Sequence, residues 1–350
     1  SKSLSIPDMM RAATGCLALH RFGYQNFQTL ADVFDRTVPQ TDPECVAFTS
    51  YVANRLTHHP NIEQSRYVNH LLDRTLGWMR AKGRRARPLA AASMIEAIAM
   101  NAGNSINGFL PQFQSSIWLL VSSKSIKVLQ LTAKTIRSVI LSITRYSRSD
   151  LEPFLHFLTQ LCIRLLSFGS GIRIYTSMIL LEIMIRLQPN FFLNYVTTLY
   201  SSISDAIDGT AAHVRSTAYA TISCFSFVDK RIFTESIAEE LFSYTAELIQ
   251  YYPGDVTRGL RTIIPNIPAW LMNKLDDLKK FVGTLLEIKN GANYALALLS
   301  TILETYKEDS FPIDNNLMEK LVKLPFTQEY KECFVNFSKV HGALEENKSI

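Results

Sequence analysis

Apolar residues recur at steps of three and four through two adjoining segments, residues 189–207 and 208–227. The first stripe consists of Phe192, Val196, Leu199, Ile203 and Ile207, and the second of Val214, Ala218, Ile222 and Phe225. Each stripe is one face of a helix, Pro189 suits a first helical turn, and Gly209 lies in the intervening turn. Because neither helix can bury its stripe alone, the pair needs neighbours of the same kind.

The same hairpin pattern recurs along the chain. Second helices are expected near residues 42, 84, 125, 171, 211, 255 and 291, a spacing of about 40. With its acidic turn and its Val214-Arg215 pair, the unit resembles a HEAT repeat. We therefore predict an all-α fold, an α-solenoid (superhelix) of HEAT/armadillo-type helical hairpins. We expect residues 1–350 to form a single solenoid of about seven to eight helix pairs. Because the helical pattern begins almost at once and the first residue is not Met, we also expect a longer parent protein.

Two local features refine the predicted hairpins. Pro265 and Pro268 should kink or end the helix that begins near residue 255, because a proline inside a helix removes a hydrogen bond. Basic residues fall early in the second helices, where stacked units can pair acid with base along the solenoid. These basic residues are Arg84, Lys127, Arg173, Arg215 and Arg258.

Composition restricts the class of partner and the compartment. The chain has 36 basic and 31 acidic residues, a net charge of +5 that does not by itself indicate nucleic acid. The 5 cysteines are odd in number and lie among apolar residues, so we expect buried, reduced thiols and a cytoplasmic location, with the nucleus as the alternative. The sequence has no signal-peptide pattern and no apolar run as long as a membrane span.

No catalytic pattern is present in the sequence. Gly169-Ser-Gly171 lacks the Lys-Ser or Lys-Thr of a phosphate-binding loop, and neither His-Arg-Asp nor Asp-Phe-Gly occurs. The adjacent His58 and His59 point to different sides of a helix, which favours a surface turn over a metal site. We therefore predict no enzyme activity, no cofactor and no metal for this stretch.

One basic cluster stands out as a candidate binding site. It consists of Lys82, Arg84, Arg85 and Arg87, with Lys124 and Lys127 one repeat later. One interpretation is a solvated turn at the start of a helix. The other is an anchor for an acidic protein surface, or else for phosphate, nucleic acid or the nuclear-import machinery. Nucleic acid is the weaker option because no aromatic residues are interleaved for base stacking.

Aromatic residues at helical spacing form a second candidate set. Phe109, Phe113 and Trp118 share one predicted helix, and Phe154 and Phe157 another. Such stripes are typical of a packed core, so the core is their expected location. Some of these rings could instead face a groove that receives a partner helix, and the sequence does not distinguish the two.

A narrower resemblance covers residues 42–141. The sequence carries Asp-Pro at 42–43, Ala-Asn-Arg-Leu at 53–56, Tyr-Val at 67–68, Arg-Thr-Leu-Gly-Trp at 74–78, Arg-Arg at 84–85 and Ala-Ala-Ala at 90–92. In this order these segments resemble the N-terminal HEAT region of the target-of-rapamycin kinases. Residues 263–268 and 294–299 resemble later segments of that family. The family's long polar insertions are missing, so a sister kinase of the phosphatidylinositol-3-kinase-related group stays open.

This resemblance implies a non-catalytic scaffold in a serine/threonine kinase whose catalytic domain lies outside this stretch. Its implied partners are a raptor-like subunit and a Rheb-like small GTPase, within a dimeric complex. The alternative hypothesis is a free-standing HEAT-repeat adaptor or a transport receptor of the importin or phosphatase-scaffold type, which binds along its concave side.

Overall fold

In its described part, the computed structural model consists of helices joined by short turns. It describes residues 72–73, 75–81, 88–101, 108–167, 169–207, 211–233, 235–306, 315–324, 327–328, 330–331, 333 and 335, and these contain no strand. The chain divides into two compact units, Ser1–Arg164 and Leu165–Ile350, which we describe separately. No helix among these residues has the length and apolar character that crossing a membrane requires.

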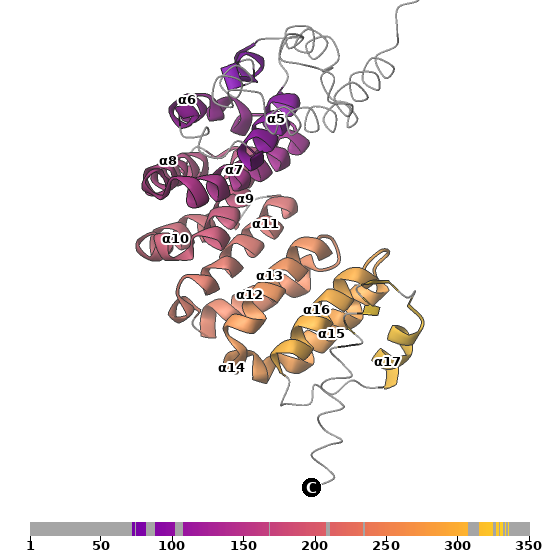
Figure 1. Ribbon diagram of the computed structural model, residues 1–350. Coiled ribbons are helices and arrows are strands. Elements are labelled where there is room, and N and C mark those ends of the chain that lie inside the picture. Colours follow the sequence, from indigo (N-terminus) through magenta and orange to yellow (C-terminus); the bar gives the residue numbers. More distant parts are fainter. Residues whose placement is uncertain are drawn as a thin grey trace, which may run out of the picture. The chain divides into compact units, whose positions relative to one another are not determined.

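In its described part the first unit is built from consecutive helices joined by turns (Figure 1). Its described residues 72–73 and 75–80 are helical, and they are followed by α5 (Pro88–Asn101), α6 (Leu110–Val121), α7 (Ile126–Tyr146) and α8 (Arg148–Ser167), the last of which crosses the unit boundary. Helix α5 packs along α7, and α6 also packs against α7. Ile95, Phe113 and Ile136 are fully buried, so the core of this unit lies between the helix layers.

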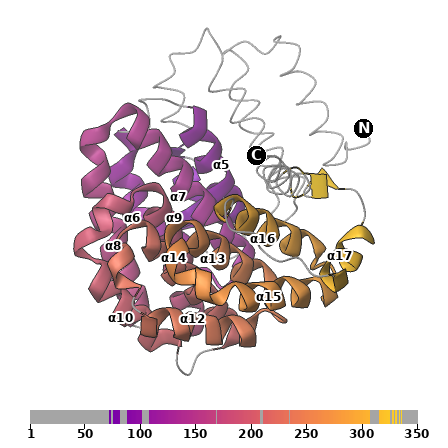
Figure 2. The ribbon, with the colours of Figure 1, turned by 90° about the horizontal axis from the view of Figure 1, so that it is seen from below.

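The second unit repeats the same hairpin. Its α-helices are α9 (Gly171–Leu187), α10 (Val196–Ile207), α11 (Ala212–Ser223), α12 (Glu235–Leu248), α13 (Pro253–Asn266), α14 (Pro268–Leu271), α15 (Leu275–Glu287), α16 (Ala292–Thr305) and α17 (Asn315–Val322). Its 3-10 helices are η4 (Pro189–Asn194), η5 (Cys224–Phe227), η6 (Lys230–Ile232) and η7 (Met272–Lys274). Helices α9, α11, α13 and α16 pack in that order as an inner layer, and α10, α12 and α15 cover α11, α13 and α16 (Figures 1 and 2).

The observed helix starts agree with the predicted period. The inner helices begin at Pro88, Ile126, Gly171, Ala212, Pro253 and Ala292. These positions lie within a few residues of those expected near 84, 125, 171, 211, 255 and 291, whereas the helix predicted near residue 42 lies outside the described residues. Successive inner elements are also hydrogen-bonded at this period, because Thr221 Oγ1 donates to the Met178 carbonyl and Asn266 Nδ2 to Ser226 Oγ, 43 and 40 residues away.

Three local expectations can be compared with the structure. Helix α13 ends at Asn266 and α14 begins at Pro268, as the two prolines predicted. Residues 189–207 form η4 and then α10 instead of one helix, and Tyr195, whose ring stacks on Phe191, lies between the two elements. The expectation of a core location is wrong for Trp118, which is 44% exposed, although Phe113 on the same helix is buried.

The predicted pairing of acidic and basic residues is only partly regular. Arg215 pairs with Glu247 of α12 at 2.7 Å, and Arg258 pairs with two carboxylates. Lys127 and Arg173 form no ion pair within the described part of the chain. Within the described residues, acidic and basic side chains therefore meet at selected repeats and do not form a continuous ladder.

Candidate protein-interaction groove

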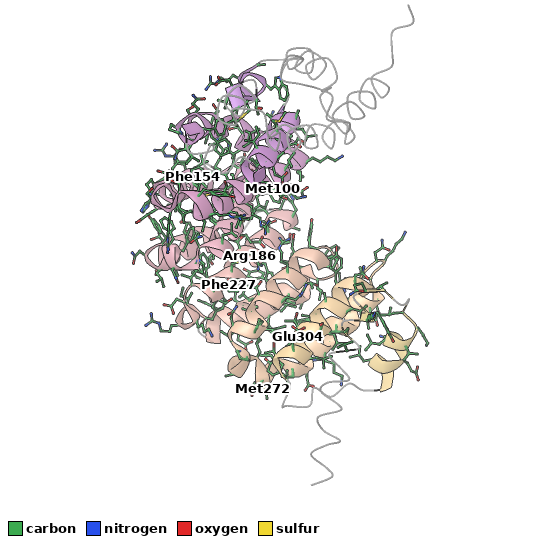
Figure 3. The ribbon with its side chains drawn as sticks, in the orientation of Figure 1. Met100, Phe154, Arg186, Phe227, Met272 and Glu304 are labelled. Carbon is green, nitrogen blue, oxygen red and sulfur yellow. The ribbon has the colours of Figure 1, made fainter. Side chains whose placement is uncertain are left out.

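An open groove of about 840 Å³ runs along the inner layer of the second unit. Residues of α9, η5, α13, α14 and α16 line it, and three of them, Arg186, Phe227 and Glu304, are labelled in Figure 3. The lining combines guanidinium groups, hydroxyl groups, aromatic rings and prolines. This mixture of apolar and hydrogen-bonding groups is typical of a surface that binds another molecule.

Helix α13 provides the central wall of the groove. Gly254, Thr257, Arg261 and Pro265 follow one another at steps of three and four, so they share one face of the helix. Helix α16 forms the facing wall, and Arg261 Nε donates to Thr301 Oγ1 across the boundary at 3.1 Å. At the start of both helices the Tyr294 ring lies over Gly254, where an added Cβ atom would be 3.3 Å from Tyr294 Oη.

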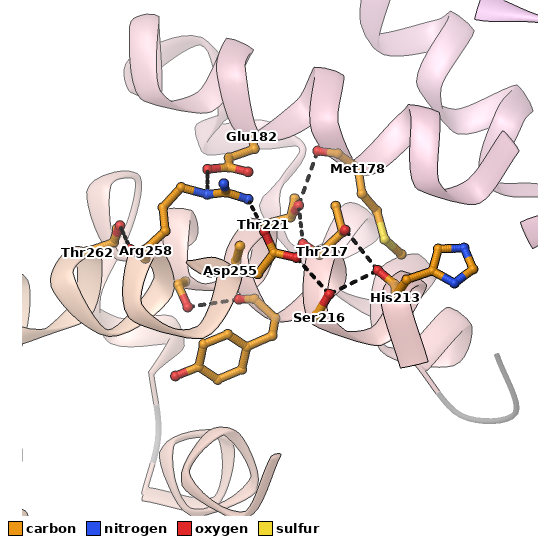
Figure 4. A network of polar contacts seen from close by, with 12 residues as sticks. Met178, Glu182, His213, Ser216, Thr217, Thr221, Asp255, Arg258 and Thr262 are labelled. Atoms are coloured by element: carbon orange, nitrogen blue, oxygen red, sulfur yellow. Dashed lines mark hydrogen bonds and ion pairs between the residues drawn. The ribbon is translucent and has the colours of Figure 1, made fainter. Parts of the chain in front are cut away.

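A buried carboxylate anchors two of the groove arginines. Glu182 of α9 is only 7% exposed, and its Oε1 lies 3.2 Å from Arg186 Nε and 2.8 Å from Arg258 Nε. Arg186 shares α9 with this carboxylate, whereas Arg258 belongs to α13 (Figure 4). Helix α11 packs between α9 and α13 and consists largely of Ala, Ser and Thr. These short side chains allow the longer ones of α9 and α13 to meet across α11.

Further hydrogen bonds fix the two arginines. Asp255 accepts from Arg258 Nη2 at 2.9 Å and from Ser216 Oγ at 2.7 Å, and Arg186 Nη2 donates to Thr262 Oγ1 at 2.8 Å. Burial lowers the pKa of Arg258, but the Glu182 and Asp255 carboxylates outweigh it, so the pKa of Arg258 lies above its ordinary value. We call these six residues, Glu182, Arg186, Ser216, Asp255, Arg258 and Thr262, the Glu182 network.

The cysteine beside this network has a buried thiol. Cys224 is fully buried and donates to the Ala220 carbonyl. Burial, with the nearby Glu182 carboxylate, raises the pKa of its thiol to about 12. Because the thiolate is the reactive form, Cys224 stays protonated near neutral pH. Cys162 and Cys333 are likewise buried thiols that form no disulfide within the described part of the chain, as the sequence predicted, while Cys16 and Cys45 lie outside the described residues.

Two hydrogen-bonding side chains of the groove have unused capacity. Arg261 is exposed, and among the described residues no carboxylate lies within ion-pair distance of it. Thr257 is only 3% exposed, and its Oγ1 atom has no hydrogen-bond partner. Within the described part of the chain no group of three or more His, Cys, Asp or Glu residues could hold a metal ion.

The basic cluster predicted from the sequence falls elsewhere. Lys82, Arg84, Arg85 and Arg87 lie outside the described residues, so their role stays a prediction. Lys124, in the turn after α6, and Lys127, in the first turn of α7, are both exposed. The groove arginines were missed as a set because they are far apart in the sequence. The irregular Pro265 and Pro268 segment, which ends the groove, was the available signal.

Comparison with known proteins supports the fold. No protein-family model matches the sequence, and no curated protein matches it. The structure of yeast importin-β (Kap95p) is similar with a TM-score of 0.64 at 12% identity, over 97% of this chain and 46% of that one. A second structure concerns Kap95p binding and the switch loops of RanGDP. It is similar with a TM-score of 0.56 at 12% identity, over 92% of this chain and 43% of that one.

These two similarities concern architecture. The chain spans less than half the length of either structure, and an identity of 12% carries no residue-level correspondence. Together with helical hairpins that recur about every 40 residues and the absence of strands among the described residues, they establish the fold class that the sequence predicted. The chain folds as an all-α solenoid of HEAT-type helical hairpins.

Proposed function

We propose that this chain is a protein-binding solenoid of the adaptor or transport-receptor kind, with no catalytic chemistry of its own. The groove along α9, α13 and α16 carries this proposal, because it offers arginine and tyrosine side chains beside exposed aromatic and proline surface. Arginine and tyrosine are among the residues that contribute most to binding energy at protein interfaces. The importin-β-like architecture supports the same conclusion.

The groove is organised before any partner arrives. Arg186 and Arg258 are fixed by Glu182, and the Arg186 guanidinium lies 5.7 Å from the centre of the Phe227 ring. A side chain already held in one conformation loses little entropy on binding. A partner would therefore meet a rigid wall on the α9 and α13 side.

Affinity capture with the tagged full chain tests this proposal. The groove variant combines Arg261→Glu with Tyr294→Ala, both at exposed side chains, so the helices should stay folded. The matched control is Arg231→Glu, a guanidinium that is 90% exposed outside the groove. We expect a set of proteins from cells of the source organism to be captured by wild type and control and lost with the groove variant. An identical set with all three proteins would overturn the proposal.

A small GTPase is a second candidate partner. The support is the similarity to Kap95p, whose structural description concerns the switch loops of RanGDP. Interferometry with a purified Ran-class GTPase, loaded with GDP or with a non-hydrolysable GTP analogue, tests it directly. Equal and negligible responses in both nucleotide states would remove the GTPase from the candidates and leave the protein-binding proposal intact.

The target-of-rapamycin hypothesis stays a prediction, and the comparisons add no support for it or for a raptor-like partner. It requires the gene to continue into a kinase core, so sequencing the gene beyond the codon for Ile350 tests it. A gene that ends near this codon would favour the free-standing adaptor.

A cytoplasmic location is likewise proposed and can be tested by imaging the tagged protein.

A further inference from the structure

We propose that the groove binds an extended partner segment in which one carboxylate, flanked by apolar residues, contacts Arg261 and Thr257. This inference rests on the proposed function and names the chemistry of its partner. It is carried by the arrangement of unused donors, charges and apolar surface along α13 and α16.

Arg261 is the cation that remains available in the groove. Its Nε atom donates to Thr301 Oγ1, which orients the guanidinium, and its remaining N–H groups have no carboxylate acceptor among the described residues. Arg186 and Arg258, by contrast, are both occupied by Glu182. A carboxylate accepts two parallel hydrogen bonds from a guanidinium, a geometry that fits an arginine oriented through its Nε atom.

Thr257 supplies a second donor one helical turn away on the same face of α13. Its hydroxyl is buried and has no partner, and such a group costs free energy until an acceptor reaches it. Tyr294, 39% exposed on the facing helix, carries a hydroxyl for which the described residues provide no hydrogen-bond partner. These two hydroxyl groups and one guanidinium are complementary to an acceptor group that carries negative charge.

The charge balance indicates one carboxylate and not a polyanion. Three arginines and Glu304 line the groove, and Glu182 and Asp255 contact Arg258 from behind the lining. Three cations thus face three carboxylates, and the wall has no surplus that would attract a phosphate backbone. The local exception is Arg261, so negative charge is favoured at that point alone.

The rest of the groove is suited to apolar residues in an extended chain. Phe227 and Tyr294 expose 41% and 39% of their surface, and Pro265 and Pro268 close the end of α13. Helix α13 has 14 residues. At about 1.5 Å per residue it extends for about 21 Å, which an extended peptide spans with about six residues.

A peptide array probed with the labelled full chain tests this inference. Its peptides are about seven residues long, blocked at both ends, with a central Glu and flanks drawn from Phe, Leu, Pro and Ser. Matched arrays carry Gln or Lys at the centre. The strongest Glu peptide is then measured by fluorescence anisotropy. We expect it to bind about tenfold or more tightly than its Gln counterpart, because a hydrogen-bonded charge is lost in the latter.

Two variants localise the binding on the protein. Arg261→Gln should weaken binding of the Glu peptide about tenfold and leave binding of the Gln peptide unchanged. Thr257→Val, which keeps the side-chain shape, should weaken binding of the Glu peptide by a smaller factor. Arg231→Gln is the matched control and should bind like wild type, and circular dichroism checks that each variant is folded.

The outcomes separate this inference from the proposed function. Equal binding of Glu and Gln peptides, or binding that Arg261→Gln leaves unchanged, would overturn the carboxylate site. Competition by heparin as effective as by the Glu peptide would also overturn it, because it would indicate non-specific attraction of polyanions. If the peptides fail while proteins captured from cells still depend on Arg261 and Tyr294, the proposed function stands and only the partner chemistry is wrong.

Discussion

The two units place a carboxylate on an inner helix in contrasting surroundings. Glu96 of α5 is half-buried, and burial raises its pKa although Lys134 and Arg137 lower it from a distance. No cation in the described part of the chain lies within ion-pair distance of Glu96, whereas Glu182 of α9 has two guanidinium groups within 3.2 Å. The difference arises from α11, whose short side chains allow α13 to reach α9. A buried charge is thus accommodated where a helix of small residues separates two partners.

The largest effect is expected from removing one partner of the Glu182 pair. Arg258→Met should leave the buried carboxylate with Arg186 alone and destabilise the second unit by about 2–3 kcal/mol. This is less than the roughly 3–5 kcal/mol typical of a broken buried pair, because Arg186 remains and Arg258 is partly exposed. Urea unfolding of the full chain, with hydrogen exchange of α11 amides as the local readout, measures the change.

The double variant Glu182→Gln with Arg258→Met is the control for this prediction. Once the buried charge is gone, stability should return to within about 1 kcal/mol of wild type. If Arg258→Met unfolds like wild type, Arg186 alone stabilises Glu182 adequately. The contrast with Glu96 then no longer depends on the Arg258–Glu182 ion pair across α11.

A second prediction concerns how closely α13 approaches α11. A Cβ atom at Gly259 would lie 2.4 Å from Tyr219 Cε1 and 2.8 Å from Ser223 Oγ. The Tyr219 ring cannot move aside easily, because it is fully buried and its hydroxyl accepts from Thr245 at 2.8 Å. Gly259→Ala should therefore push the helices apart and cost about 1–3 kcal/mol, although alanine favours helices.

Gly283 of α15 provides the matched control, because a Cβ atom there has nothing within 4 Å. Gly283→Ala should stabilise the same unit by about 0.5–1 kcal/mol. Thermal unfolding of both variants measures the two effects. If both variants raised the free energy of unfolding, the approach of α13 to α11 would not limit the packing that brings Arg258 to Glu182.

The hairpins and their boundaries could be predicted because they depend on local periodicity. Phe192, Val196, Leu199 and Ile203 are buried as their spacing required, and the break at Pro265 follows from proline chemistry. The exposure of Trp118 could not be predicted, because helical spacing does not reveal whether a second layer covers a face.

The groove could not be predicted as a site. Glu182 and Arg258 are two repeats apart, and they meet only because three inner helices stack with small residues on the middle one. Arg258 was expected early in a second helix and to pair with an acid of a neighbouring unit. Sequence periodicity alone cannot identify a partner two helices away, because the size of α11's side chains determines that distance.

A third prediction tests what the two units share. Thr135 Oγ1 donates to the Ala92 carbonyl in the first unit, and Thr221 Oγ1 donates to the Met178 carbonyl in the second, each 43 residues away. Replacing either with Val should cost about 1 kcal/mol, the usual contribution of a buried hydrogen bond. Hydrogen exchange in α5 and α9 measures the two losses. Similar losses of stability would show that this hydrogen bond contributes equally in the inner layers of both units. A loss in one unit only would contradict that.

The smallest predicted effect returns to the unpaired carboxylate. Because the pKa of Glu96 is raised on folding, the folded chain holds that proton more tightly than the unfolded chain. This contribution is fully present below the unfolded pKa of about 4.3 and is lost as pH rises through the folded pKa. Glu96→Gln should therefore raise stability near neutral pH, by less than about 1 kcal/mol because solvent screens a half-exposed group. Glu182→Gln should lower it under the same conditions, since Arg186 and Arg258 lose a shared partner. Urea unfolding at pH 4 and pH 7 compares the two variants. If both variants lowered the free energy of unfolding near neutral pH, Lys134 and Arg137 would stabilise Glu96 as effectively as the paired arginines stabilise Glu182.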